Sequence, residues 1–139
     1  METGNSKSQT VDPKERGPFT VFVDGAGCRP DGTGSGFAWL CTTTKEKRIE
    51  RVPGLTNNQA EYRALIAALT ALPDGARAEV FSDSQLLCYQ FDGSYKVRDP
   101  DLANSLEQVH SLIKEKKLSL TVRWVPREKN LAGKLLEQR

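Results

Sequence analysis

The sequence is short of the two residue types that most often bind zinc or carry redox chemistry. Its 139 residues include one histidine, His110, and three cysteines, Cys28, Cys41 and Cys88. The cysteines are odd in number, widely spaced and form no C-x-x-C pair, which disfavours a disulfide framework, a zinc site and a redox motif. Reduced thiols are typical of the cytoplasm. A single histidine inside a helical pattern is most often a surface or core residue, so His110 is given no role.

Long apolar runs and a strong net charge are also missing. No apolar stretch approaches the ~18 residues of a membrane-spanning helix, and the polar N-terminus lacks the apolar core of a secretory signal. The formal net charge is only +2, so nucleic-acid binding would have to come from a local surface and depend on salt. We therefore expect a cytoplasmic protein that makes no membrane contact and acts as a monomer.

The chain divides into a polar tail and one folded domain. Residues 1–18 are polar and show no periodicity, which predicts a disordered tail. The remaining residues, 19–139, have the length and ordinary composition of one α/β domain.

The sequence FTVFVDGAG, residues 19–27, predicts the central strand of this domain. A short apolar run followed by Gly-x-Gly is typical of a buried strand. Asp24 stands at its C-terminal end, where an unpaired buried charge would be costly. Two interpretations remain open from this stretch alone: Asp24 caps the glycine turn, or it binds a metal ion.

The remaining pattern predicts one mixed sheet flanked by helices. Two antiparallel strands should follow the first, the third exposed, and later strands should be linked by helical crossovers. The helix from Asp99-Pro100 has an Asp N-cap and Pro at its first position. The expected strands are 37–43, 45–52, 76–83 and 118–125, with Leu118, Leu120, Val122 and Trp124 facing inward; the expected helices are 60–72, 84–91, one starting at 99–100, and a short C-terminal one.

Glu61 is out of place on the helix predicted for residues 60–72. Thr56 and Gln59 form a capping-box pattern before it. Glu61, Leu65, Ala68 and Leu72 fall on one face, so the carboxylate points toward the core from the first turn. The helix dipole favours an acid there by ~0.3–1 kcal/mol, but it does not explain that direction.

Asp83 ends the fourth predicted strand and completes a possible trio with Asp24 and Glu61. A cap of the following helix, supplied by Asp83 or Ser82, is the alternative interpretation. Sites in α/β sheets form at the C-terminal ends of strands, and three adjacent anions repel unless a cation joins them. Oxygen ligands alone select Mg²⁺ or Mn²⁺. Two such ions support in-line phosphoryl transfer, so the residues predict a metal-dependent nuclease.

Four segments together resemble type 1 ribonuclease H. They are FVDGA at 22–26, TNNQAEY at 56–62, SDSQL at 82–86 and WVPREKN at 124–130. The resemblance implies a ribonuclease H-like fold with a five-stranded mixed sheet. It also implies metal-dependent hydrolysis of the RNA strand of an RNA–DNA hybrid. The loop at 93–101 resembles the compact bacterial and archaeal branch, which lacks a basic handle.

The resemblance also implies roles for individual residues. Asp24, Glu61 and Asp83 match three of the four acids that bind the family's metal ions. Other matched positions contact the hybrid, several of them reading the 2′-hydroxyl that separates RNA from DNA. The positions in the minor groove are Gly27, Asn57, Asn58, Ser84 and Gln85, and Thr56 matches a position that holds a DNA-strand phosphate. For Asn57 and Asn58, helix capping is the structural alternative.

The sequence departs from the family pattern at the fourth acid. The pattern Asn-x-x-Ala-Asp, counted from Asn130, places Lys134 where an aspartate is expected. Asn130 in a shifted register, Glu137 or Glu128 are the alternative ligands. Two functions therefore stay open: an active hybrid-cleaving ribonuclease, and a hybrid-binding module with weak or lost catalysis.

Overall fold

The structure is a computed structural model in which residues 17–137 are described. The predicted disordered tail therefore lies outside the described residues except for Gly17 and Pro18. Gly17 is buried, and its carbonyl accepts a hydrogen bond from Nη2 of Arg77 at 3.1 Å. These two residues belong to the folded domain, which the sequence placed from Phe19 onward.

The five strands form one mixed sheet, as predicted. Its order is β4-β3-β2-β5-β6, so the first strand of the chain is the central one. β2 pairs antiparallel with β3, and β3 with β4, whereas β5 is parallel to β2 and to β6. The strands are β2 (Phe19–Ala26), β3 (Gly36–Cys41), β4 (Lys47–Arg51), β5 (Arg77–Ser82) and β6 (Ser119–Trp124).

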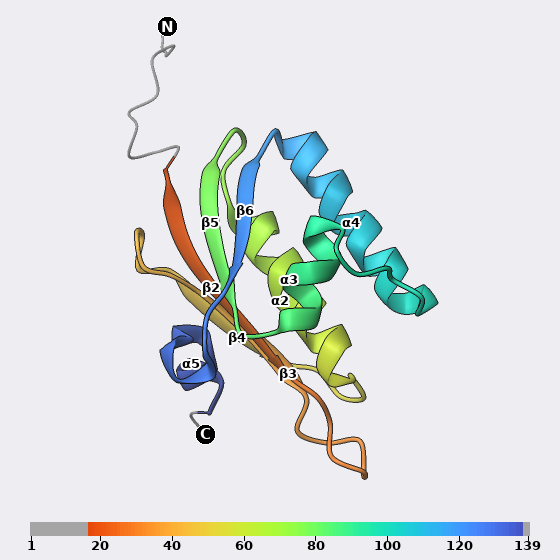
Figure 1. Ribbon diagram of the computed structural model, residues 1–139. Coiled ribbons are helices and arrows are strands. Elements are labelled where there is room, and N and C mark those ends of the chain that lie inside the picture. Colours follow the sequence, from red (N-terminus) through yellow and green to blue (C-terminus); the bar gives the residue numbers. More distant parts are fainter. Residues whose placement is uncertain (1–16, 138–139) are drawn as a thin grey trace, which may run out of the picture.

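The helices cover the two faces of the sheet unequally (Figure 1). Three helices lie on one face and the short C-terminal helix α5 lies on the other. The three are α2 (Asn57–Ala71), α3 (Gln85–Asp92) and α4 (Pro100–Lys116); α5 (Leu131–Glu137) follows a 3₁₀ turn, η1 (Arg127–Lys129).

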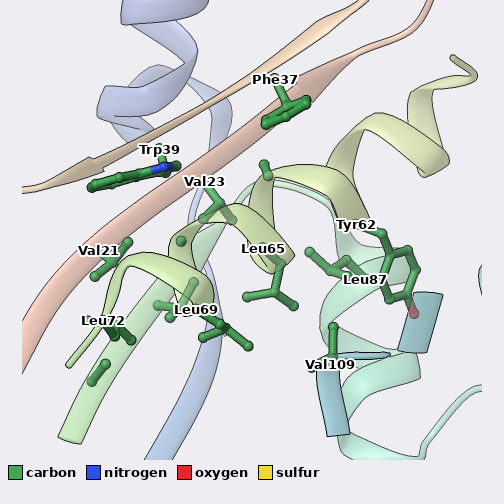
Figure 2. Close-up of a cluster of buried hydrophobic side chains, with 14 of the residues drawn as sticks. Val21, Val23, Phe37, Trp39, Tyr62, Leu65, Leu69, Leu72, Leu87 and Val109 are labelled. Carbon is green, nitrogen blue, oxygen red and sulfur yellow. The ribbon is translucent and has the colours of Figure 1, made fainter. Parts of the chain in front are cut away.

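The main core lies between the sheet and α2 (Figure 2). Side chains alternate along β2, so Val21 and Val23 point to the helices and pack with Leu65 and Leu69. Burying a Val or Leu side chain contributes about 1.5–3 kcal/mol. A smaller cluster on the opposite face joins the sheet to α5; it contains Phe22, Ala26, Ala38, Ala132, Leu135 and Leu136.

Helix α2 begins three residues earlier than predicted. Thr56 is its N-cap and forms the expected capping box with Gln59, so the first helical residue is Asn57. Glu61 consequently lies in the second turn, and the first turn holds no acid. The dipole explanation for Glu61 is weakened by this placement, because the effect fades beyond the first turn.

The predicted inward alternation along the last strand is wrong for Trp124. Its side chain is 48% exposed, Leu120 and Val122 are partly buried, and Leu118 is buried but lies before β6. β6 is an edge strand, so neighbouring elements cover it less than they cover a central strand. The indole instead donates to the Asp83 carbonyl, with Nε1–O at 3.2 Å.

Within residues 17–137, no helix has the length and apolarity needed to cross a bilayer. Cys28 is exposed, Cys41 and Cys88 are buried, and all three are free thiols. The cytoplasmic location and monomeric state expected from the sequence stay predictions.

Candidate active site

Gly25 allows α2 to approach the central strand closely. A Cβ atom at Gly25 would lie 2.3 Å from the Ala60 carbonyl carbon and 2.4 Å from the Glu61 amide nitrogen. Only glycine leaves this space. The Gly25 N–H also donates to Oε1 of Glu61 at 3.1 Å. The contact thus places the carboxylate of Glu61, a residue that is only 8% exposed, near the C-terminal end of β2.

The pairing of β2 with β5 positions the two aspartates. Phe22 is directly opposite Phe81 in this parallel pair, and their rings stack with centroids 5.2 Å apart. Asp24 and Asp83 each follow two residues later. Side chains two residues apart in a strand share a face, so the register brings the two carboxylates together on the side of the sheet that α5 covers.

The three acids predicted from the sequence converge. Asp24, Glu61 and Asp83 each offer a carboxylate oxygen, and the three oxygens lie within 4.8 Å of one another. In residues 17–137 they are the only such group of three histidine, cysteine or acidic side chains.

Convergence and burial raise the pKa of two of these carboxyls. Burial, then the charge of Asp83 and a hydrogen bond with it, raise the pKa of Asp24 to about 7. Burial, then the charges of Asp24 and Asp83, raise the pKa of Glu61 to about 9. The backbone N–H of Gly25 and the positive charge of Arg127 act in the opposite direction on both groups. The protein alone does not supply enough positive charge to keep both Asp24 and Glu61 ionised at neutral pH.

This arrangement fits a hard divalent cation. The donors are carboxylate oxygens, their spacing allows them to share one ion, and a cation would relieve the repulsion that raises the two pKa values. Asp24, Glu61 and Asp83 are the residues that would hold it.

Two hollows open beside the acids. The larger, about 590 Å³, extends from Asp24 toward α5, and the smaller, about 270 Å³, contains all three acids together with Asn57 and Ser84. Arg127 lines both. The sequence analysis missed Arg127, although it lies within the quoted WVPREKN segment. Nothing in one sequence separates it from the neighbouring charges of Glu128 and Lys129, which are also exposed.

The three acids lie within a segment that matches the model of a known protein family. The model of the RNase H family matches residues 16–133, which is most of the chain. The chain belongs to the RNase H family. The match ends at Gly133, one residue before Lys134.

Individual relatives of this RNase H chain agree with that assignment. Ribonuclease HI of Halobacterium salinarum is 32% identical over 109 residues, covering 74% of this chain and 54% of that protein. A bifunctional protein of Mycobacterium tuberculosis is 43% identical over 77 residues, covering 54% of this chain and 21% of that protein. The chain therefore spans about half the length of the first relative and about a fifth of the second.

Among solved structures, LC11-RNase H1 in complex with an RNA/DNA hybrid is similar throughout the fold. Its TM-score is 0.75 at 31% identity, and the alignment covers 85% of this chain and 92% of that chain. The five-stranded mixed sheet predicted from the sequence is thus the RNase H fold.

Helix α3 of this RNase H domain is capped by Ser84 and not by Asp83 or Ser82. Ser84 caps α3 by accepting from the Leu87 N–H at 3.1 Å, and the Ser82 hydroxyl accepts from the Ser84 N–H at 3.0 Å. The predicted cap by Asp83 or Ser82 is therefore wrong. The Asp83 carboxylate is left to the acidic cluster.

Of the predicted hybrid-contact residues, Gly27 and Asn57 line the larger hollow, and Asn57 and Ser84 line the smaller one. Thr56, Asn58 and Gln85 line neither hollow. Thr56 caps α2, so capping does not account for Asn57 or Asn58. Asn57 Oδ1 instead accepts from the Gly27 N–H at 2.6 Å and joins the end of β2 to α2. Asn58 and Gln85 are exposed, and within the described residues neither side chain forms a hydrogen bond.

The candidates for the fourth metal ligand in this RNase H domain differ in burial and in their hydrogen bonds. Asn130 is fully buried; its Nδ2 donates to the Val23 carbonyl at 2.9 Å and its Oδ1 accepts from the Ala132 N–H at 3.1 Å. Its amide is thus committed to the backbone. Lys134, Glu137 and Glu128 line the larger hollow, but neither of these glutamates joins the cluster within 4.8 Å.

Proposed function

We propose that this protein is a metal-dependent endonuclease that hydrolyses the RNA strand of RNA–DNA hybrids. The observation that carries the proposal is the convergence of Asp24, Glu61 and Asp83 near the C-terminal end of the central strand of an RNase H sheet. Their carboxylate oxygens lie within 4.8 Å of one another. Family membership supports it, as does the likeness to a relative solved in complex with an RNA/DNA hybrid. Mg²⁺ or Mn²⁺ is the cofactor that this donor set favours.

The reaction requires one bond to form and one to break. A water oxygen bonds to phosphorus, a bridging P–O bond breaks, the water gives up a proton and the leaving oxygen gains one. A bound divalent ion would supply Lewis-acid stabilisation of the charge on the phosphate oxygens. Asp24, Glu61 and Asp83 would hold and orient it. Arg127, exposed beside them, offers a planar guanidinium to a strand phosphate.

Substrate choice in this proposal depends on polar groups beside the acids. The exposed amides of Asn58 and Gln85 and the half-buried hydroxyl of Ser84 can donate to and accept from 2′-hydroxyls and base edges. Asn57 holds Gly27 beside the larger hollow, so it contributes to the shape of the groove-facing surface.

A second candidate function is a hybrid-binding module with weak or lost catalysis. The position of Lys134 favours this second candidate. Lys134 lines the same hollow as Asp24, and it stands where the family pattern has an aspartate. The three retained acids favour the active enzyme.

One assay distinguishes the candidates. Purified protein is incubated with an end-labelled RNA–DNA hybrid, with Mg²⁺, with Mn²⁺ and with EDTA, alongside a DNA duplex of the same sequence. The proposal expects cleavage of the RNA strand that depends on metal, and an intact DNA duplex. Tight hybrid binding without cleavage in either metal would support the binding module, and equal cutting of the DNA duplex would indicate a general nuclease.

A further inference from the structure

The peptide unit between Asp83 and Ser84 lies just beyond the end of the sheet. β5 ends at Ser82, which is directly opposite Trp124 in the parallel pair with β6. The Ser82 carbonyl accepts a hydrogen bond from the Val125 N–H at 2.9 Å. Asp83 follows at a bend between β5 and α3, so it belongs to neither a strand nor a helix.

Side chains hold both polar groups of this peptide unit. The Asp83 carbonyl accepts from Nε1 of Trp124 at 3.2 Å, and the Ser84 N–H donates to the Ser82 hydroxyl oxygen at 3.0 Å. Because a peptide unit is planar, the two bonds together fix its orientation and the ψ angle of Asp83. The direction of the Asp83 carboxylate relative to the sheet depends on that angle, since its side chain leaves the same Cα atom.

Burial does not account for the tryptophan at this position. Trp124 is 48% exposed at the end of an edge strand, so much of its ring contributes no apolar burial. Water can also replace the indole N–H at the exposed carbonyl with little change in folding free energy. A mobile water molecule would not hold the peptide unit in one orientation, whereas an indole anchored to β6 does.

The neighbouring acids make such a restraint useful. Oxygens of Asp24, Glu61 and Asp83 lie within 4.8 Å of one another, and ionised carboxylates at this spacing repel. Asp24 lies within β2, and Glu61 lies within α2 and accepts from the Gly25 N–H. Asp83 is the one member of the trio that regular secondary structure does not hold.

We propose that Trp124 is a positioning residue of the metal site: its indole N–H, together with the Ser82 hydroxyl, aims the Asp83 carboxylate at the bound ion. The inference rests on the proposed nuclease function, in which Asp83 is a metal ligand. Trp124 acts through Asp83 and makes or breaks no bond in the reaction. Groups that orient metal ligands typically change metal affinity by about 10- to 100-fold.

Two substitutions separate the N–H donor from the bulk of the ring. Trp124→Phe keeps an aromatic ring but removes the donor. Trp124→His loses bulk but places Nε2–H at the same position of a five-membered ring as the indole Nε1–H. At pH 8 a histidine with the ordinary pKa of about 6.5 is neutral, so no positive charge is added. A role of the donor predicts that the His variant binds metal better than the Phe variant, and a role of bulk alone predicts the reverse.

A Mn²⁺ titration of the hybrid-free full chain, with free Mn²⁺ read by electron paramagnetic resonance, measures the effect without turnover. We expect Trp124→Phe to bind Mn²⁺ about 10-fold more weakly than the wild type and Trp124→His to fall between them. Tyr95→Phe is the matched control, because Tyr95 is also 48% exposed and lies in the loop after α3, and its affinity should not change. In cleavage assays, Trp124→Phe should lose kcat at low Mg²⁺, recover it at high Mg²⁺ and keep the KM for the hybrid.

The inference and the proposed function fail in different ways. Equal Mn²⁺ affinity of Trp124→Phe and the wild type would overturn the inference while metal-dependent cleavage remains, and a lower free energy of unfolding in EDTA would then show that Trp124 only supports the fold. Tighter Mn²⁺ binding by Trp124→Phe than by Trp124→His would also overturn it. A wild type that neither binds Mn²⁺ nor cleaves the hybrid would overturn the proposed function, and the inference with it.

Discussion

The backbone nitrogen of Gly25 and Oε1 of Glu61 are 3.1 Å apart and form the hydrogen bond that joins the central strand to helix α2 at the acidic cluster. Gly25 does two things at this contact: it leaves room for the helix backbone, and it donates to a buried carboxylate. The donation lowers the pKa of Glu61 against the larger effect of burial, which raises it. Fold and site therefore depend on the same residue.

Replacing Gly25 with alanine should damage stability and activity together. The new Cβ would lie 2.3 Å from the backbone of α2, so strand and helix must separate. Overpacking of this kind costs about 1–3 kcal/mol, and the displaced Glu61 would leave the cluster. We expect a reduced free energy of unfolding in urea and loss of hybrid cleavage.

Glu61→Gln is the comparison for that variant. It keeps the side-chain size and the acceptor for Gly25 but removes the titrating group, so it should lose cleavage while keeping or raising the free energy of unfolding at neutral pH. A Gly25→Ala protein as stable and active as the wild type would show that the close approach does not position Glu61.

Stability in EDTA should fall as the pH rises from about 4 to about 9. The pKa of Asp24 rises from 3.8 to about 7 on folding, and that of Glu61 from 4.5 to about 9. At these two groups the folded state therefore binds more protons than the unfolded chain across this range, and each group reduces stability by at most about 1.4 kcal/mol per pH unit. Urea unfolding at several pH values measures the slope.

Two changes should flatten that slope. Mg²⁺ should remove much of it, because the ion favours the ionised carboxylates. Asp24→Asn removes one group and part of the repulsion that raises the pKa of Glu61. A metal-free wild type whose stability is constant or increases between pH 5 and 8 would contradict the electrostatic description of the site.

Asn58→Ala should weaken hybrid cleavage without changing the stability of the fold. The Asn58 side chain is exposed, and no hydrogen bond to it is found in the described part of the chain. An unpaired polar partner in the bound complex costs about 1–3 kcal/mol, which corresponds to a loss in kcat/KM of about 5- to 150-fold. Asn57→Ala is the contrast, because it breaks the 2.6 Å bond to Gly27 and should also lower stability. Unchanged cleavage by Asn58→Ala would remove Asn58 from the hybrid-contact surface.

Patterns with a local physical cause predicted much of this structure from the sequence. The apolar run that ends in Asp24 is the central strand, and Asp99 and Pro100 begin α4 as expected. The trio of acids could be predicted because Asp24 follows an apolar strand and Glu61 lies on the buried face of a helix, and Asp83, at the end of the next predicted strand, completes them.

Features set by packing between distant segments could not be predicted in this way. The exposure of Trp124 follows from the edge position of β6, and the commitment of Asn130 to Val23 depends on how α5 docks on the sheet. The position of Arg127 beside the three acids is likewise a feature of tertiary structure. None of these leaves a periodic signal in a single sequence.

The central claim is that Asp24, Glu61 and Asp83 form a metal site that hydrolyses the RNA strand of a hybrid, and Asp24→Asn tests it most directly. The variant is compared with the wild type for cleavage of a labelled hybrid in Mg²⁺ and Mn²⁺, and for unfolding in EDTA at pH 8. We predict no detectable cleavage in either metal and a free energy of unfolding equal to or above that of the wild type, because repulsion within the trio is relieved. Near-normal turnover by a folded Asp24→Asn protein would contradict the claim.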